Sequence, residues 1–192
     1  MLRSLALILA LLLTGMMSAR AEDSSQQAFD RDAQAAIKEL ATSLKSSLMA
    51  AMNDGGPAEA VSVCNLIAPS LAAEISKKYG LEIGRTSLKV RNPANEADAW
   101  ETDVLQRFET RLASGEAIQK LTFKEKVDSE SGSQWRMMKA IPTDKVCLSC
   151  HGKKIAEPIQ ARIEAHYPDD LATGFKLGDI RGAFTVKRDI VD

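Results

Sequence analysis

The chain has 192 residues, of which 25 are Lys or Arg and 26 are Asp or Glu. Because these charges nearly cancel, the composition gives no warrant for binding nucleic acid or an anionic membrane surface. A chain of this length is sufficient for one domain with a substantial core, and no internal repeat or low-complexity tract suggests otherwise.

The N-terminus has the pattern of a secretory signal peptide. Arg3 precedes an apolar stretch from Leu5 to Leu13, and residues 19–21 read Ala-Arg-Ala, a small-x-small cleavage site. We therefore expect residues 1–21 to be removed and the mature chain to be exported to the periplasm. The alternative is an uncleaved anchor, because the stretch from Leu5 to Met17 is only mildly interrupted. No later segment approaches the roughly 20 apolar residues of a membrane helix, so the mature chain is expected to lack a stable membrane span.

Residues 22–80 predict a helical hairpin. Apolar residues at helical spacing follow Ser24 and Ser25, either of which could cap a helix running to about Met52. The sequence Asn-Asp-Gly-Gly-Pro at 53–57 then breaks it. A second helix is expected from Pro57 to about Tyr79, because Pro suits a first turn and Gly80 suits a C-terminal cap.

Residues 81–192 predict mainly strands with helices between them. Strands are expected at 81–92, 118–127, 134–141 and 182–190, and helices at about 97–113 and at 157–166, with a turn at Gly132. This order indicates an α+β fold in which an antiparallel sheet has flanking helices and forms one structural unit with the preceding hairpin. It favours a sensor-like domain over an all-helical one.

Residues 147–151 read Cys-Leu-Ser-Cys-His, the attachment signature for c-type haem. Cys147 and Cys150 can form thioethers with the porphyrin vinyl groups, and His151 can then serve as the proximal iron ligand. Export is consistent with this prediction, because haem c is attached on the far side of the bacterial inner membrane. The sequence therefore predicts covalent haem c.

Two other uses of a Cys-x-x-Cys pair remain open. A zinc site needs further ligands at similar spacing, and only the isolated Cys64 and His166 are available. A redox dithiol should open a helix directly after a strand, whereas Pro142 and the residues after it give only a short irregular lead-in. Neither fits as well as haem attachment.

Four separated blocks resemble one family in order. They are Arg-Thr-Ser-Leu-Lys-Val-Arg-Asn-Pro-Ala-Asn at 85–95, Trp-Glu at 100–101, Cys-Leu-Ser-Cys-His-Gly at 147–152 and Gly-Asp-Ile-Arg-Gly-Ala at 178–183. From roughly Phe29 to Val186 the chain resembles the DUF3365 family of haem-c proteins. The resemblance implies a haem-bearing PAS-like domain preceded by helices, of a kind found alone and fused to signalling modules. It implies no known reaction.

The resemblance also suggests a helical cysteine as second axial ligand, which here is Cys64. Packing is the alternative, since Cys64 lies on an apolar helical stripe and buried free Cys often behaves as a small hydrophobe. Other candidates for this position, each with a structural alternative, are His166, Met49, Met52, Met137 and Met138.

Haem propionates need cationic partners, and Arg85, Arg91 and Arg181 lie in the family-like blocks. Ordinary solvation on an exposed strand face is the alternative for each of them.

Two classes of function follow. One is a redox or small-ligand sensing haem protein, which would bind a diatomic ligand at the iron and signal through a partner protein. The alternative is a soluble periplasmic electron carrier with a redox partner. No carboxylate pair, Ser-His-Asp set or phosphate loop is evident in the sequence, so peroxidase-like turnover is the only enzymatic hypothesis.

Overall fold

The computed structural model describes residues 2–130 and 132–190, and their side chains at 23–62, 65–130 and 132–190. The elements follow the predicted order, with a long kinked helix, a strand, a helix, two strands, a short helical segment, a helix and a closing strand. The helices are α1 (Leu2–Tyr79), α2 (Ala99–Ala113), α3 (Leu148–His151) and α4 (Glu157–His166). The strands are β1 (Glu82–Thr86), β2 (Thr122–Ser129), β3 (Gly132–Pro142) and β4 (Ile180–Asp189). Short 3-10 turns are η1 (Pro93–Asn95), η2 (Ile118–Lys120) and η3 (Lys145–Cys147).

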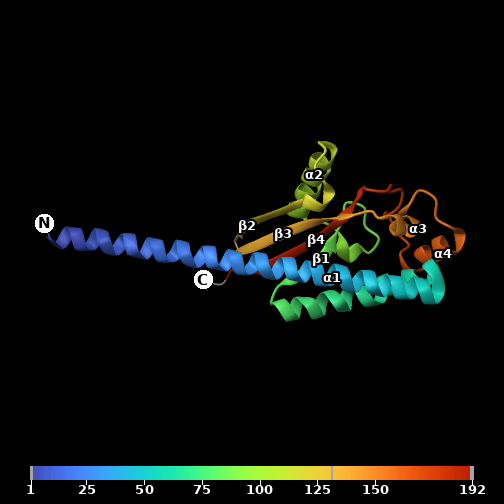
Figure 1. Ribbon diagram of the computed structural model, residues 1–192, viewed down its shortest axis with the longest axis horizontal. Helices are drawn as coiled ribbons and strands as arrows, with labels where there is room; N and C mark the ends of the chain where they lie inside the picture. The colour runs from blue at the N-terminus through green and yellow to red at the C-terminus, as the bar shows by residue number, and fades with distance from the viewer. Residues whose placement is uncertain (1, 131, 191–192) are drawn as a thin grey trace.

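Helix α1 is a helix pair rather than one straight rod. Gly56 has φ 77° and ψ −176°, so the helical path breaks where the sequence predicted it. The second arm then runs back along the first (Figure 1), and the Glu39 carboxylate accepts hydrogen bonds from Lys78 Nζ and Tyr79 Oη at 2.7 and 2.8 Å. The predicted hairpin is confirmed. Among the residues whose side chains are described, no single helix could cross a membrane, although the two arms together meet the criterion of length and composition.

The predicted start of the first helix at Ser24 or Ser25 is wrong for the full chain, because α1 begins at Leu2. The physical reason is that the preceding residues, mostly Leu and Ala, themselves favour a helix and no proline interrupts them.

The four strands form one antiparallel sheet in the order β1-β4-β3-β2. β2 and β3 are a hairpin closed by the pair Ser129 and Gly132, and β4 lies between β3 and β1. The strand expected to reach Asn92 ends at Thr86 instead. Ser87 leaves the sheet because its hydroxyl accepts a hydrogen bond from the Lys89 amide at 3.1 Å, which offers the backbone a local partner. The strand expected from Ile118 likewise begins only at Thr122, after η2.

Helices α1 and α2 lie on opposite faces of the sheet (Figure 1), and the core has one layer of side chains on each face. Met137 packs against α1 with Phe29 and Trp135, whereas its neighbour Met138 packs against α2 with Phe108. Adjacent residues of a strand point to opposite faces, so the two methionines belong to different layers. A third cluster joins α4 to α1 and includes Val61, Ile159, Ile163 and Tyr167. The architecture is the predicted α+β fold.

Candidate functional site

The two thiols of the Cys-x-x-Cys-His sequence lie on one turn of helix. Cys147 has helical backbone angles (φ −65°, ψ −29°) and α3 follows directly, so Cys147 and Cys150 are one turn apart on the same side. Neither cysteine forms a disulfide and both are half-buried; burial raises the pKa of Cys147, which is therefore a neutral thiol at neutral pH. The turn ends at Gly152, where a Cβ atom would lie 2.5 Å from the Leu148 carbonyl oxygen. Only glycine fits there.

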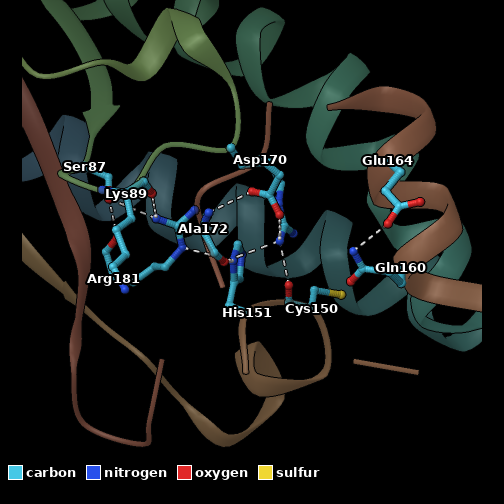
Figure 2. Close-up of polar contacts among 10 residues, drawn as sticks. Ser87, Lys89, Cys150, His151, Gln160, Glu164, Asp170, Ala172 and Arg181 are labelled. Atoms are coloured by element: carbon cyan, nitrogen blue, oxygen red, sulfur yellow. Dashed lines mark hydrogen bonds and ion pairs between the residues drawn. The ribbon is translucent and has the colours of Figure 1, made fainter. Parts of the chain in front are cut away.

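His151 has two possible partners at the same ring nitrogen. Nδ1 lies 2.7 Å from the Ala172 carbonyl oxygen and 3.2 Å from Arg181 Nε, as Figure 2 shows. A carbonyl oxygen can only accept a proton and a guanidinium nitrogen can only donate one, so the two hydrogen bonds require different tautomers. The shorter contact favours a proton on Nδ1. Nε2 then keeps the lone pair that a metal ligand needs.

The surroundings keep His151 neutral. Burial, followed by the charges of Arg181 and Arg91, lowers the pKa of this imidazole to about 2, while the hydrogen bond to Ala172 opposes the shift. The ring also meets Phe175 edge-on, with centroids 6.3 Å apart and planes at 89°. The histidine is therefore fixed in direction and uncharged across the physiological pH range.

The three arginines predicted at the site have different environments. Arg181 on β4 donates to Ser87 Oγ at 3.1 Å and lies over the Phe175 ring. Burial, with the charges of Arg91 and Arg85, lowers the pKa of Arg181 to about 10, so it remains a cation at neutral pH. Arg85 on β1 also lowers the pKa of His151, though less than the other two do. All three positive charges thus act on the same imidazole.

Arg91 is engaged with protein partners. Its guanidinium forms a two-point ion pair with Asp170, and its Nη2 donates to the Cys150 carbonyl oxygen at 2.6 Å. The side chains of Arg91 and Asp170 are only 9% and 8% exposed, so this pair is buried. Arg91 therefore links the loop after β1 to the helical turn that carries the cysteines.

Cys64 lies in the second arm of α1, but its side chain is outside the described residues. Val61, one helical turn earlier, packs in the cluster that Cys150 joins. His166 is placed at the end of α4, with Nε2 3.5 Å from Ser62 Oγ. Met49 is exposed and Met52 half-buried, while Met137 and Met138 belong to the two core layers.

Two cavities flank the cysteine and histidine turn, and neither is lined by Cys147, Cys150 or His151. The larger, about 600 Å³, lies beside α4 and includes Lys153, Lys154 and Tyr167 in its wall. The smaller, about 320 Å³, is bounded by Phe175, by Glu109 on α2 and by the turn after β1. Desolvation, with some repulsion from Asp179, raises the pKa of Glu109.

No sequence pattern predicted Asp170, Ala172 and Phe175, which lie around His151. They belong to a loop between α4 and β4 that has no periodic pattern, and Pro168 followed by two aspartates signalled only a turn. The loop is held to the turn by hydrogen bonds from the amides of Phe175 and Gly174 to the carbonyls of His151 and Gly152, at 3.0 and 3.1 Å.

Comparison with known proteins places this chain. A crystal structure of the cyanobacterial heme-protein Tll0287 is similar to it, with 26% sequence identity and a TM-score of 0.54 over 90% of this chain and 96% of that one. No curated protein matches the chain. The Tll0287-like family model matches residues 11–188. Since that match spans nearly the whole sequence, the chain belongs to the Tll0287-like family.

Proposed function

We propose that this protein carries one covalent haem c, bound through thioethers at Cys147 and Cys150, with His151 as proximal ligand. The main support for the proposal is the charge and hydrogen bonding of His151. It is neutral, its Nδ1 is bound to the Ala172 carbonyl oxygen, and it directly follows two thiols on one turn. Proximal histidines in haem proteins need such an outer partner to fix the ring and its tautomer. A similar chain is a haem protein, which supports the same conclusion.

The second part of the proposal concerns the role of that haem. When bound, haem supplies a one-electron couple and an iron position at which a ligand can exchange. We assign Cys64 as the second axial ligand, since its place on α1 is one turn from Val61, which packs in the cluster containing Cys150. Positive charge for the propionates comes from Arg85, Arg181 and Arg91, although Arg91 is also paired with Asp170. A thiolate ligand favours ferric iron and can be lost on reduction, which suits a redox or gas sensor in the periplasm.

Attachment is tested by purifying the protein from the periplasm of a host with a cytochrome c maturation system. We expect intact mass spectrometry to show a chain cleaved after Ala21 and heavier by one haem, with the haem retained in acidified acetone. A Cys147→Ala/Cys150→Ala variant should release any bound haem in the same solvent, and Cys64→Ala should retain it. Extraction of haem from the unaltered protein would contradict covalent attachment.

The role is tested by optical and electron paramagnetic resonance spectra of the ferric and ferrous protein, with and without carbon monoxide. A low-spin thiolate signal that disappears in Cys64→Ala, together with carbon monoxide binding after reduction, is expected for the sensor. Spectra of two nitrogen ligands, or of nitrogen and thioether ligands, that carbon monoxide leaves unchanged would instead favour an electron carrier and leave Cys64 as a packing residue.

A further inference from the structure

The ion pair of Arg91 and Asp170 is buried and lies next to the helical turn that carries His151. Arg91 Nε and Nη2 lie 3.1 and 2.9 Å from the two oxygens of the Asp170 carboxylate. Both side chains are more than nine-tenths buried. Burying an ion pair costs desolvation energy that the attraction often only balances, so such a pair is better explained by the geometry it imposes than by added stability.

Asp170 also sets the orientation of the residue that faces the imidazole. Its Oδ1 accepts a hydrogen bond from the Ala172 amide at 2.9 Å, and the Ala172 carbonyl oxygen lies 2.7 Å from His151 Nδ1. Arg91 also contacts the helical turn, because its Nη2 donates to the carbonyl oxygen of Cys150, the residue before His151. The Arg91 guanidinium thus fixes the loop and the helical turn relative to each other.

Two groups compete for His151 Nδ1, and their distances decide the outcome. If the Ala172 carbonyl moved away, Arg181 Nε at 3.2 Å would remain as a donor, which favours an unprotonated Nδ1 and a proton on Nε2. That tautomer has no lone pair at Nε2 for a metal. We propose that Arg91 and Asp170 are positioning residues that hold the Ala172 carbonyl against His151 and so fix the ligating tautomer before haem binds. The consequence for the haem rests on the function proposed above, whereas the tautomer does not.

The first test uses the haem-free full chain, labelled with ¹⁵N at histidine. The chain has only two histidines, so His166 is an internal reference in every spectrum. Long-range ¹H–¹⁵N correlations should show His151 protonated at Nδ1. In Arg91→Lys, which keeps the charge but loses the two-point geometry, and in Asp170→Asn, the Nε2–H form should gain about tenfold, while His166 stays unchanged. Wild-type tautomers in both variants would overturn the proposal.

The matched control is the ion pair of Arg162 and Glu59, which also joins two elements but is about half exposed, at 3.3 Å. Arg162→Lys and Glu59→Gln should leave the His151 tautomer unchanged. If Asp170→Asn does not fold, as judged by circular dichroism, Arg91→Lys decides alone, since it leaves no buried charge without a partner of opposite sign.

The second test uses the haem-loaded protein. Outer partners of a metal-bound histidine raise its basicity, so Arg91→Lys should favour the ferrous form by about tenfold, a shift of about 59 mV to more positive potential in a one-electron couple. The control variants should not shift it. If the variants shift the His151 tautomer as expected but the unaltered protein binds no haem, the proposed function alone is refuted. Covalent haem with unaffected tautomer and potential would refute the positioning role alone.

Discussion

Gly182 on β4 shows at the scale of one residue how closely two strands approach beside the site. It has φ 156°, and a Cβ atom there would lie 2.3 Å from the Thr86 carbonyl oxygen, which is backbone and cannot turn aside. Any side chain at position 182 would therefore push β1 and β4 apart, next to Arg181, which contacts His151.

We expect Gly182→Ala to lower the free energy of unfolding by about 1–3 kcal/mol, the usual cost of overpacking. Urea unfolding followed by circular dichroism measures it. Gly84→Ala is the matched control on the paired strand, because a Cβ atom there meets only Thr185 Cγ2 at an ordinary 3.9 Å. Equal losses in the two variants would show that strand glycines in general, and not this contact, account for the effect.

At the scale of an element, the start of α2 is fixed by a capping box. Asp98 accepts a hydrogen bond from the Glu101 amide at 2.8 Å, and the Glu101 side chain accepts one from the Asp98 amide at 3.1 Å. Burial by itself would raise the pKa of Asp98. The hydrogen bond from the Glu101 amide and the contact with Arg136 outweigh it, so the pKa lies below its ordinary value of 3.8.

A carboxyl group with a lowered pKa in the folded state stabilises the fold above its unfolded pKa, and this contribution is lost as the pH falls through the folded value. We therefore expect the stability advantage of the unaltered protein over Asp98→Asn to be constant near neutral pH and to shrink below about pH 4. Asn still caps a helix, so this comparison isolates the charge. Asp98→Ala also removes the cap and should cost about 0.5–2 kcal/mol at neutral pH. Urea unfolding over a pH series checks both, and a pH-independent difference would contradict the assignment.

At the scale of the whole molecule, one sheet separates two core layers, and one tryptophan reports on each. Trp135 lies in the layer under α1, and Trp100 packs against the layer under α2. Because β3 contributes Met137 to one layer and Met138 to the other, neither layer can lose its packing without disturbing the strand that both share.

We expect the two layers to unfold together. In the haem-free chain, Trp100→Phe and Trp135→Phe each leave one reporter, and the two fluorescence transitions in urea should coincide with circular dichroism. Met137→Ala and Met138→Ala should each lower stability by about 2–5 kcal/mol and shift both transitions equally. Separate midpoints for the two reporters would show that the layers fold independently.

The order of elements could be read from local patterns. Helix α4 begins and ends where its sequence predicted, and the break before Pro57 followed from two glycines and a proline, because backbone freedom and a missing amide act wherever they occur. The Cys-x-x-Cys-His turn was equally visible, since its chemistry depends on residues adjacent in sequence.

The groups that surround His151 are brought together only by folding. Arg91 comes from the loop after β1, whereas Asp170 and Ala172 come from the loop between α4 and β4, and their hydrogen bonds depend on atoms that folding brings within about 3 Å. No periodicity marks such residues, because loops have none. The early end of β1 had a local cause instead, since the hydroxyl of Ser87 accepts a hydrogen bond from the Lys89 amide two residues later and so competes with the sheet for the backbone. Local sequence patterns were enough to predict the order of the helices and strands and the two thiols beside a histidine, whereas tertiary contacts determined the charge state and direction of that histidine.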